Sequence, residues 1–261
     1  MLVTGMDRRG QRKARNTGGE EGLDLADVAQ FRQAAYRLFS MLLLYPDAER
    51  LRSVAAVARK LKGHDDFLAT FPFFIQWKYL LDTLRSLADL QPARVQEEYI
   101  TLFIANPEYS PCLPYESAYI ESGGATGWTA VRIEQEYAAA GFSISSSLNE
   151  VPDHVAVELE FMSLLCDQEA SAWERKRLNN GVDGLKRQAA FLEGHLNRWF
   201  PALAGAVARR RSSGIYAAVT RAVQSFVAHD SDLLKALGER FELSADARLA
   251  DLTSKTPQQG M

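Results

Sequence analysis

The spacing of apolar residues predicts helices along most of the chain. From Leu25 onward, apolar side chains recur at steps of three and four residues, which places them on one face of an α-helix. This run ends at Tyr45-Pro46-Asp47, because a proline disfavours helical geometry in the residue before it. The pattern therefore predicts a long amphipathic first helix that begins near Leu25.

Further apolar runs with the same spacing follow, and each is stopped by Gly, Pro or Asp. They lie within residues 51–61, 74–84, 95–103, 131–142, 155–165, 185–199 and 215–227. The alternation typical of strands is nearly absent, and its only candidate, residues 142–148, contains serines that favour a loop. The sequence predicts an all-α fold, a single globular bundle of roughly nine to twelve helices.

The two ends of the chain differ in composition from this bundle. Residues 1–22 are rich in Gly, Arg and Glu, and their few large apolar side chains cannot offset the entropy lost on ordering. No repeat and no low-complexity linker divides the part between the ends. We expect a disordered basic tail at 1–22, an all-helical domain at 23–245 and a flexible C-terminal tail at 246–261.

Composition and charge then exclude several classes of protein. The longest purely apolar run, residues 41–44, is far shorter than the ~20 residues that cross a bilayer. A net charge of −3 argues against a nucleic-acid partner, which requires a concentrated basic face. The two cysteines, Cys112 and Cys166, are typical of reduced thiols in a cytosolic protein. We expect a cytoplasmic protein without stable membrane insertion.

A pair of arginines, Arg8-Arg9, stands near the start of the chain. Such a pair is a feature of twin-arginine export signals. Residues 10–21 are polar, however, and lack the apolar region that a signal peptide needs after its basic part. We therefore do not expect export of this chain.

The segment 106–117 is a proline-rich interruption between predicted helices. Pro107, Pro111 and Pro114 fix backbone dihedral angles and remove amide donors, so the segment is stiff and extended. It presents Tyr109, Leu113 and Tyr115 at defined positions, which suits the capture of an apolar peptide. The alternative is a plain connection between helices that packs on the core.

A second irregular segment, residues 150–162, reads as the start of a helix. Pro152 suits a first helical turn, and Asp153 favours the positive end of the helix dipole. His154 and Glu158 stand four residues apart on one face, a spacing that permits a hydrogen bond or two metal ligands. A metal site needs three or four ligands, and no second cluster with ligand spacing occurs. Motifs for a catalytic nucleophile or for phosphate binding are also missing, so no catalytic residue, metal or cofactor is expected.

Several short motifs occur in an order that resembles the TorD/DmsD-like family of redox-enzyme maturation chaperones. They are Leu102-Phe103, Pro114 to Tyr119, Pro152-Asp153-His154, Val157 to Met162, Phe191-Leu192, His195-Leu196 and Trp199. The resemblance covers most of Phe31 to Trp199, and the Pro-Asp-His helix start is its most specific element.

The resemblance implies an all-helical cytoplasmic chaperone, a monomer or homodimer, that is not an enzyme. Such a protein binds the twin-arginine signal peptide and the apo catalytic subunit of a molybdenum-cofactor oxidoreductase, aids cofactor insertion and holds back export until maturation. The candidate peptide-binding residues are Tyr99, Leu102, Phe103, Pro114, Tyr115, Glu116, Asp153 and His154. Tyr99 and Tyr115 stand where some members have tryptophan.

The chemistry of a signal peptide explains some of these positions independently. Its two arginines and apolar stretch require a carboxylate beside an aromatic groove, which Asp153 or Glu116 and the loop with Tyr115 offer. We expect Asp153→Ala and Tyr115→Ala each to weaken precursor binding without changing helicity. His154 either orients Asp153 or is an ordinary histidine at a helix start.

Two other functions compete with this interpretation. One is a small helical metal- or nucleotide-dependent enzyme that uses His154 and Glu158, which metal analysis of the purified protein would detect. The other is a helical scaffold, which would lack affinity for any signal peptide.

Overall fold

Helices make up most of the protein, as the apolar spacing predicts. The computed structural model describes residues 2–4, 24–61, 68–86, 92–121, 127–145 and 150–254. Within these residues the chain forms ten α-helices, one π-helix and two short strands. The predicted all-α class and the predicted number of helices are confirmed for this part of the chain.

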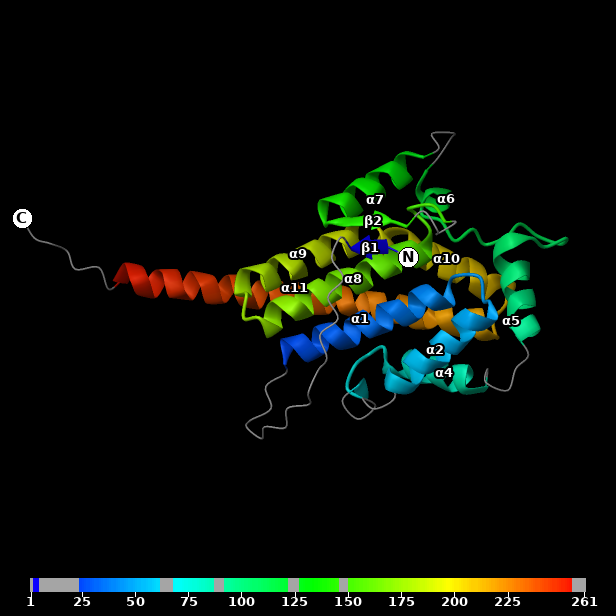
Figure 1. Ribbon diagram of the computed structural model, residues 1–261, viewed down its shortest axis with the longest axis horizontal. Coiled ribbons are helices and arrows are strands. Elements are labelled where there is room, and N and C mark those ends of the chain that lie inside the picture. The colour runs from blue at the N-terminus through cyan, green and yellow to red at the C-terminus, as the bar shows by residue number, and fades with distance from the viewer. Residues whose placement is uncertain are drawn as a thin grey trace, which may run out of the picture.

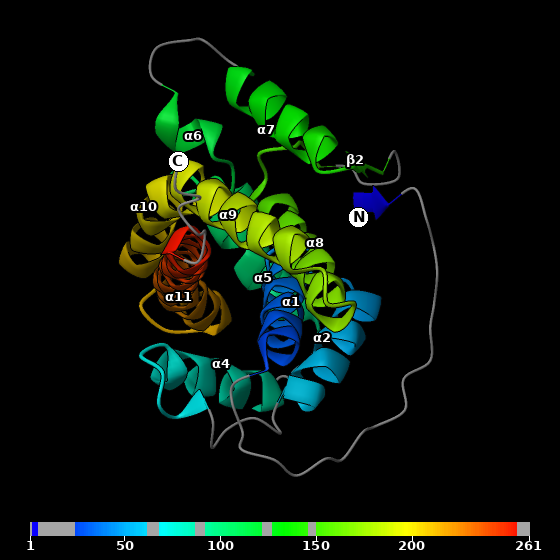
Figure 2. The ribbon, with the colours of Figure 1, turned by 90° about the vertical axis from the view of Figure 1, so that its left-hand side faces the viewer.

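Long helices that lie along one axis form the body of the molecule (Figure 1). The helices are α1 (Leu25–Leu42), α2 (Ala48–Leu61), α4 (Phe74–Ser86), α5 (Pro92–Tyr99), η2 (Ile100–Ile104), α6 (Ser117–Ile120), α7 (Trp128–Ala139), α8 (Val155–Glu174), α9 (Leu178–Gly194), α10 (Leu196–Arg210) and α11 (Ile215–Ser254). Helix α8 packs against α1 and α9, while α9, α10 and α4 pack against α11. Helices α6 and α7 lie together at one side of this body (Figure 2).

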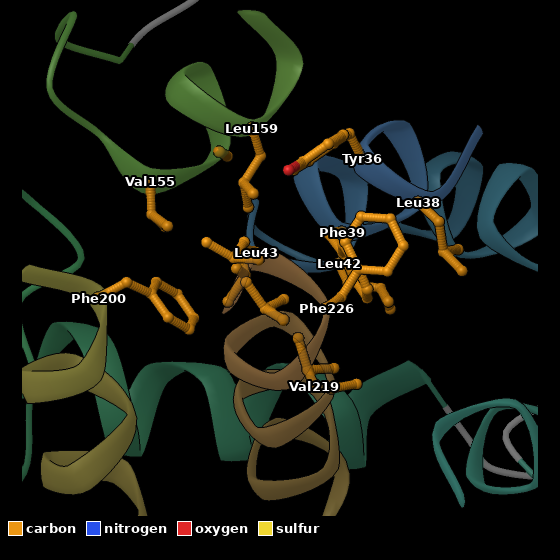
Figure 3. Packing of buried hydrophobic residues seen from close by; sticks show 14 of the residues in the cluster. Tyr36, Leu38, Phe39, Leu42, Leu43, Val155, Leu159, Phe200, Val219 and Phe226 are labelled. Carbon is orange, nitrogen blue, oxygen red and sulfur yellow. The ribbon is translucent and has the colours of Figure 1, made fainter. Parts of the chain in front are cut away.

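The first helix shows how the sequence builds the core. Asp24 is its N-cap, and its carboxylate accepts a hydrogen bond of 2.9 Å from the amide of Ala26. Tyr36 and Phe39 lie on its buried face and contact Phe226 of α11 edge to face, with ring centroids 5.2 and 5.4 Å apart (Figure 3). Burial of each such side chain stabilises the fold by about 1.5–3 kcal/mol.

A buried arginine joins four of the long helices, and we call its contacts the arginine clamp. Arg32 of α1 donates hydrogen bonds to Asp230 of α11 at 2.5 Å, Glu169 of α8 at 2.7 Å and Gln188 of α9 at 2.5 Å. Tyr36 also donates to Asp230, at 2.7 Å. All five side chains are at most 2% exposed, so the clamp is part of the interior.

The structure corrects the expectation that residues 142–148 form a loop. Strand β2 (Phe142–Ile144) pairs antiparallel with strand β1 (Leu2–Thr4), from the other end of the sequence. Figures 1 and 2 both show β1 beside β2. A three-residue strand is held by its partner rather than by local preference, so apolar spacing does not reveal it.

The expected N-terminal tail lies largely outside the described residues, whereas the expected C-terminal tail is described as far as Ser254. Of the basic tail at 1–22, the structure describes the three residues of β1. At the other end, α11 continues to Ser254, past the expected boundary at residue 245.

Candidate functional site

Two segments carrying the motifs of the resemblance are joined by backbone hydrogen bonds. The amide of Val155 donates to the carbonyl of Pro114 at 2.9 Å, and the amide of Glu116 donates to the carbonyl of Asp153 at 3.0 Å. Between them, Tyr115 and His154 form an antiparallel bridge, and their rings meet edge to face at 5.1 Å. The proline-rich loop is therefore fixed to the start of α8.

The π-helix η2 holds two further candidate residues in the core. The amide of Ala105 bonds to the carbonyl of Ile100 at 2.9 Å, which is the wider turn of a π-helix. Leu102 and Phe103 are 1% and 4% exposed, and the carbonyl of Leu102 accepts from the amide of Cys112 at 2.7 Å. The apolar spacing at 95–103 predicted an ordinary helix here, and this wider turn was missed.

Both carboxylates expected to bind an arginine already interact with this chain's own donors. Asp153 is 2% exposed and accepts a hydrogen bond of 3.1 Å from the amide of Ser117, at the start of α6. Glu116 is fully buried and lies 2.7 Å from Nδ1 of His195 and 3.6 Å from the guanidinium of Arg132. In this structure neither carboxylate faces solvent.

His154 is the N-cap of α8. Its Nδ1 accepts a hydrogen bond of 3.1 Å from the amide of Ala156. Burial lowers the pKa of His154 to about 4, so the ring is neutral at neutral pH. The approach of its Nε2 to a carboxylate oxygen of Glu150, at 3.9 Å, is therefore not an ion pair. The structure gives His154 the role of a histidine that caps a helix.

Aromatic side chains lie beside this junction. Tyr99 is 5% exposed and contacts Phe103 and Tyr216, with ring centroids 5.1 and 5.6 Å away. Tyr45, which is 40% exposed, lies edge to face on Tyr99 at 5.7 Å. Tyr115 is half-buried. The aromatic part of the candidate site therefore reaches the surface at Tyr45 and Tyr115.

Glu150 is a carboxylate that the sequence reasoning did not select. Its side chain is 24% exposed, and its charge helps to raise the pKa of Tyr99 and of Tyr115, on which burial acts most strongly. Burial also raises the pKa of Glu150 itself, and Arg50 partly opposes that rise. Within the described ranges, no lysine or arginine lies within 4.0 Å of its carboxylate. Its position two residues before the Pro-Asp-His motif was the available signal.

Exposed apolar side chains accompany these residues. Leu113 directly precedes the paired segment 114–116, and Val151 directly follows Glu150. They are 43% and 49% exposed. With Tyr45, which contacts Tyr99, they supply exposed apolar surface on the same segments as the candidate residues.

A second group of charged residues lies behind the junction, and we call it the carboxylate cluster. Its members are Glu116, Arg132, Glu136, Glu158 and His195. Burial raises the pKa of Glu158 well above its usual value, and the nearby Glu116 adds to this rise. The indole of Trp199 donates to Glu158 at 3.1 Å.

The expected pair of His154 and Glu158 does not form a site. His154 caps α8, whereas Glu158 lies against Glu116 and Trp199. Among the residues whose positions are described, no three His, Cys, Asp or Glu side chains are grouped in a way that could hold a metal ion. No described helix is both long and apolar enough to cross a membrane.

Comparisons with known proteins identify relatives. The nitrate reductase delta subunit family matches residues 74–205, just over half of the chain. A protein named Chaperone protein TorD from Vibrio cholerae serotype O1 is 29% identical over 162 residues, 61% of this chain and 72% of that protein. Another from Photobacterium profundum is 31% identical over 163 residues, 61% and 71% of the two chains.

A solved structure described as a redox enzyme maturation protein from Archaeoglobus fulgidus is also similar, with 24% identity and a TM-score of 0.49. It covers 82% of this chain and 99% of that one. The family match and the TorD relatives confirm the resemblance seen in the motifs, and TorD proteins are chaperones rather than enzymes. The chain therefore belongs to the nitrate reductase delta subunit and TorD chaperone family.

Proposed function

We propose that the protein is a cytoplasmic chaperone for the catalytic subunit of a molybdenum-cofactor oxidoreductase. It binds the twin-arginine signal peptide and the apo form of this subunit, aids cofactor insertion and holds back export until maturation is complete. Membership of the TorD chaperone family supports the class of function. The family's description names nitrate reductase, which supports a redox enzyme as the client.

The observation that carries the peptide-binding part of the proposal is the environment of Glu150. This carboxylate is half-buried, lies close to Tyr115 and has no lysine or arginine within 4.0 Å among the described residues, although Arg50 acts on its pKa from further away. An arginine of a peptide would form charge-assisted hydrogen bonds with the carboxylate and stack on the aromatic ring. Glu150 thus fits one arginine of the signal peptide.

The apolar part of the peptide then has a surface on which to pack. Tyr45, Leu113 and Val151 are each at least 40% exposed. Their burial beneath a peptide would be favourable at about 25 cal/mol per Å² of apolar area.

We assign direct contact with the peptide to Tyr115 and Glu150, and a positioning role to the other candidates. Asp153 accepts a hydrogen bond from the amide of Ser117 in α6, and His154 caps α8, so each fixes the paired segments from which Tyr115 projects. The remaining positioning residues are Tyr99, Leu102, Phe103, Pro114 and Glu116. The loss of binding expected for Asp153→Ala would then come with a local change in structure.

Isothermal titration with a twin-arginine signal peptide of a molybdoenzyme tests the proposal. We expect Glu150→Gln and Tyr115→Ala each to weaken binding by about tenfold, or about 1.4 kcal/mol. Glu134→Gln removes the same charge from an exposed position on α7 and should bind like the wild type. A twin-lysine peptide should bind more weakly, because lysine cannot form the bidentate contact.

Two results would contradict this assignment. Unchanged affinity in both site variants would remove Glu150 and Tyr115 from the binding surface. An absence of binding to several twin-arginine peptides by the wild-type protein would overturn the proposed function itself.

A further inference from the structure

Strand β2 is an edge that accepts another strand. Leu2, Val3 and Thr4 lie opposite Ile144, Ser143 and Phe142 in the antiparallel pair. Backbone amides and carbonyls on a strand edge need partners, and an extended peptide of almost any sequence supplies them. At present the chain's own N-terminus occupies this edge.

The occupant has the properties of a replaceable strand. The pair is three residues long, and a two-stranded pair of this size is marginally stable alone. Nineteen residues separate Thr4 from Asp24, so β1 is a tethered strand rather than a continuation of the bundle. A competing peptide therefore has to displace only a short ladder.

The direction of the pair suits a signal peptide. Because the strands are antiparallel, the N-terminal end of the incoming strand lies at Ile144, which is the end of β2 nearer to Glu150 in the sequence. Six residues span at most about 21 Å, so Glu150 lies within that distance of the edge. In a signal peptide the basic residues precede the apolar stretch. A leader bound in the orientation of β1 would thus place its arginines at the Ile144 end of β2, within this distance of Glu150, and its apolar stretch along β2.

The two faces of β2 also suit an apolar strand. Phe142 is buried, Ser143 is exposed and Ile144 is half-buried, so one face lies on the core and the other faces solvent. An incoming strand with apolar residues at alternate positions would extend the buried face, as in other complexes formed by strand addition.

The chain's own arginine pair has the opposite order. Arg8-Arg9 follows β1 in the sequence, whereas the arginines of a signal peptide precede its apolar stretch. Strand β1 therefore does not reproduce the order of basic and apolar residues in a signal peptide.

We propose that β2 is a docking edge for an extended segment of the client's signal peptide, which binds by displacing β1. The identity of this peptide rests on the proposed function, whereas the edge itself does not. The N-terminal strand then acts as a tethered competitor that lowers the affinity for weak ligands.

A reversible crosslink tests the displacement. Val3→Cys/Ser143→Cys places two cysteines at directly opposite positions, within the Cα separation that a disulfide spans. The native Cys112 and Cys166 are buried and should not interfere. We expect the oxidised double variant to bind the signal peptide about tenfold more weakly or not at all, and a reductant to restore binding. The single variants under the same oxidant are the controls.

Weakening β1 should act in the opposite direction. Val3→Pro/Thr4→Pro removes two successive amide donors, of which at least one faces β2. We expect this variant to bind the signal peptide roughly threefold more tightly, because the edge no longer has to be vacated.

Two outcomes would overturn the proposal. The first is equal peptide affinity in the oxidised and reduced states of the cysteine pair. The second is detected by adding a synthetic peptide with the sequence of residues 1–9 to the proline variant: no gain of amide-exchange protection at residues 142–144 would show that β2 accepts no strand. This second measurement uses no client peptide, so it separates failure of the edge from failure of the proposed function.

Discussion

The arginine clamp and the carboxylate cluster bury charge in different ways. In the clamp, Glu169 accepts hydrogen bonds from Arg32, Gln188 and Trp173, and Asp230 accepts from Arg32 and Tyr36. In the carboxylate cluster, one oxygen of Glu116 and one of Glu158 are buried without a hydrogen-bond donor among the described residues. The clamp joins four helices. In the carboxylate cluster, by contrast, the hydrogen bonds depend on which of its groups carry a proton.

The pKa shifts also differ between the clamp and the carboxylate cluster. Burial alone would lower the pKa of Arg32, but Asp230 and Glu169 hold it well above its usual value, so Arg32 keeps its charge at any physiological pH. Burial would likewise lower the pKa of His195, yet its hydrogen bonds to Glu116 and Glu136 raise it. Burial raises the pKa of Glu158. The cluster therefore contains groups whose charge depends on pH, whereas Arg32 of the clamp stays charged.

The largest effect is expected from breaking the clamp. Arg32→Met removes the cation and leaves Asp230 and Glu169 buried without their partner, which should lower the free energy of unfolding by about 3–5 kcal/mol. Urea unfolding followed by circular dichroism measures the loss. The control is Arg85→Met, which breaks an exposed pair with Asp82 and should cost less than about 1 kcal/mol. Equal losses in the two variants would show that the clamp contributes nothing beyond a surface ion pair.

A smaller and pH-dependent effect is expected at His195. His195→Gln removes the cation between Glu116 and Glu136 and should destabilise the protein by about 3 kcal/mol near pH 6. Because the folded-state pKa of His195 is raised, its contribution is complete below the unfolded value of about 6.5 and is lost as pH rises through the folded value. Unfolding curves between pH 5.5 and 9 should show that the difference in free energy of unfolding between wild type and variant decreases as pH rises. A difference in free energy of unfolding that stays constant with pH would contradict this role.

The smallest effect is expected at Glu158. Burial favours the protonated form of this side chain, and glutamine resembles a protonated glutamate. The free energy of unfolding of Glu158→Gln should therefore stay within about 1 kcal/mol of the wild-type value near pH 4.5. As pH rises above the ordinary carboxyl pKa of about 4.3, the unfolded wild type loses a proton that the folded form retains, so the wild type loses stability. The variant lacks this loss. Between pH 4 and 8, its urea midpoint should therefore rise relative to the wild-type midpoint. Parallel pH profiles would indicate that Glu158 is ionised in the fold.

Sequence patterns located most of the fold. The first helix, predicted to begin near Leu25, runs over Leu25–Leu42, and the predicted start of a helix at the Pro-Asp-His motif is the start of α8 at Val155. These features are local, because apolar residues three and four apart share a helix face and prolines stop helices within the same few residues. The motifs of the resemblance are equally local, which explains why the family could be identified from them.

The tertiary structure alone decided which carboxylates face solvent. Asp153, Glu116 and Glu150 look alike in the sequence, but the first two are buried because residues 114–117 pair with residues 153–155, and Glu150 lies just outside this pairing. The strand pair Leu2–Thr4 with Phe142–Ile144 likewise joins distant segments. Apolar spacing indicates that a helix has a buried face, but it does not indicate which distant segment covers that face. The sequence by itself therefore determined the helices and the family, and long-range packing decided the chemistry of the candidate site.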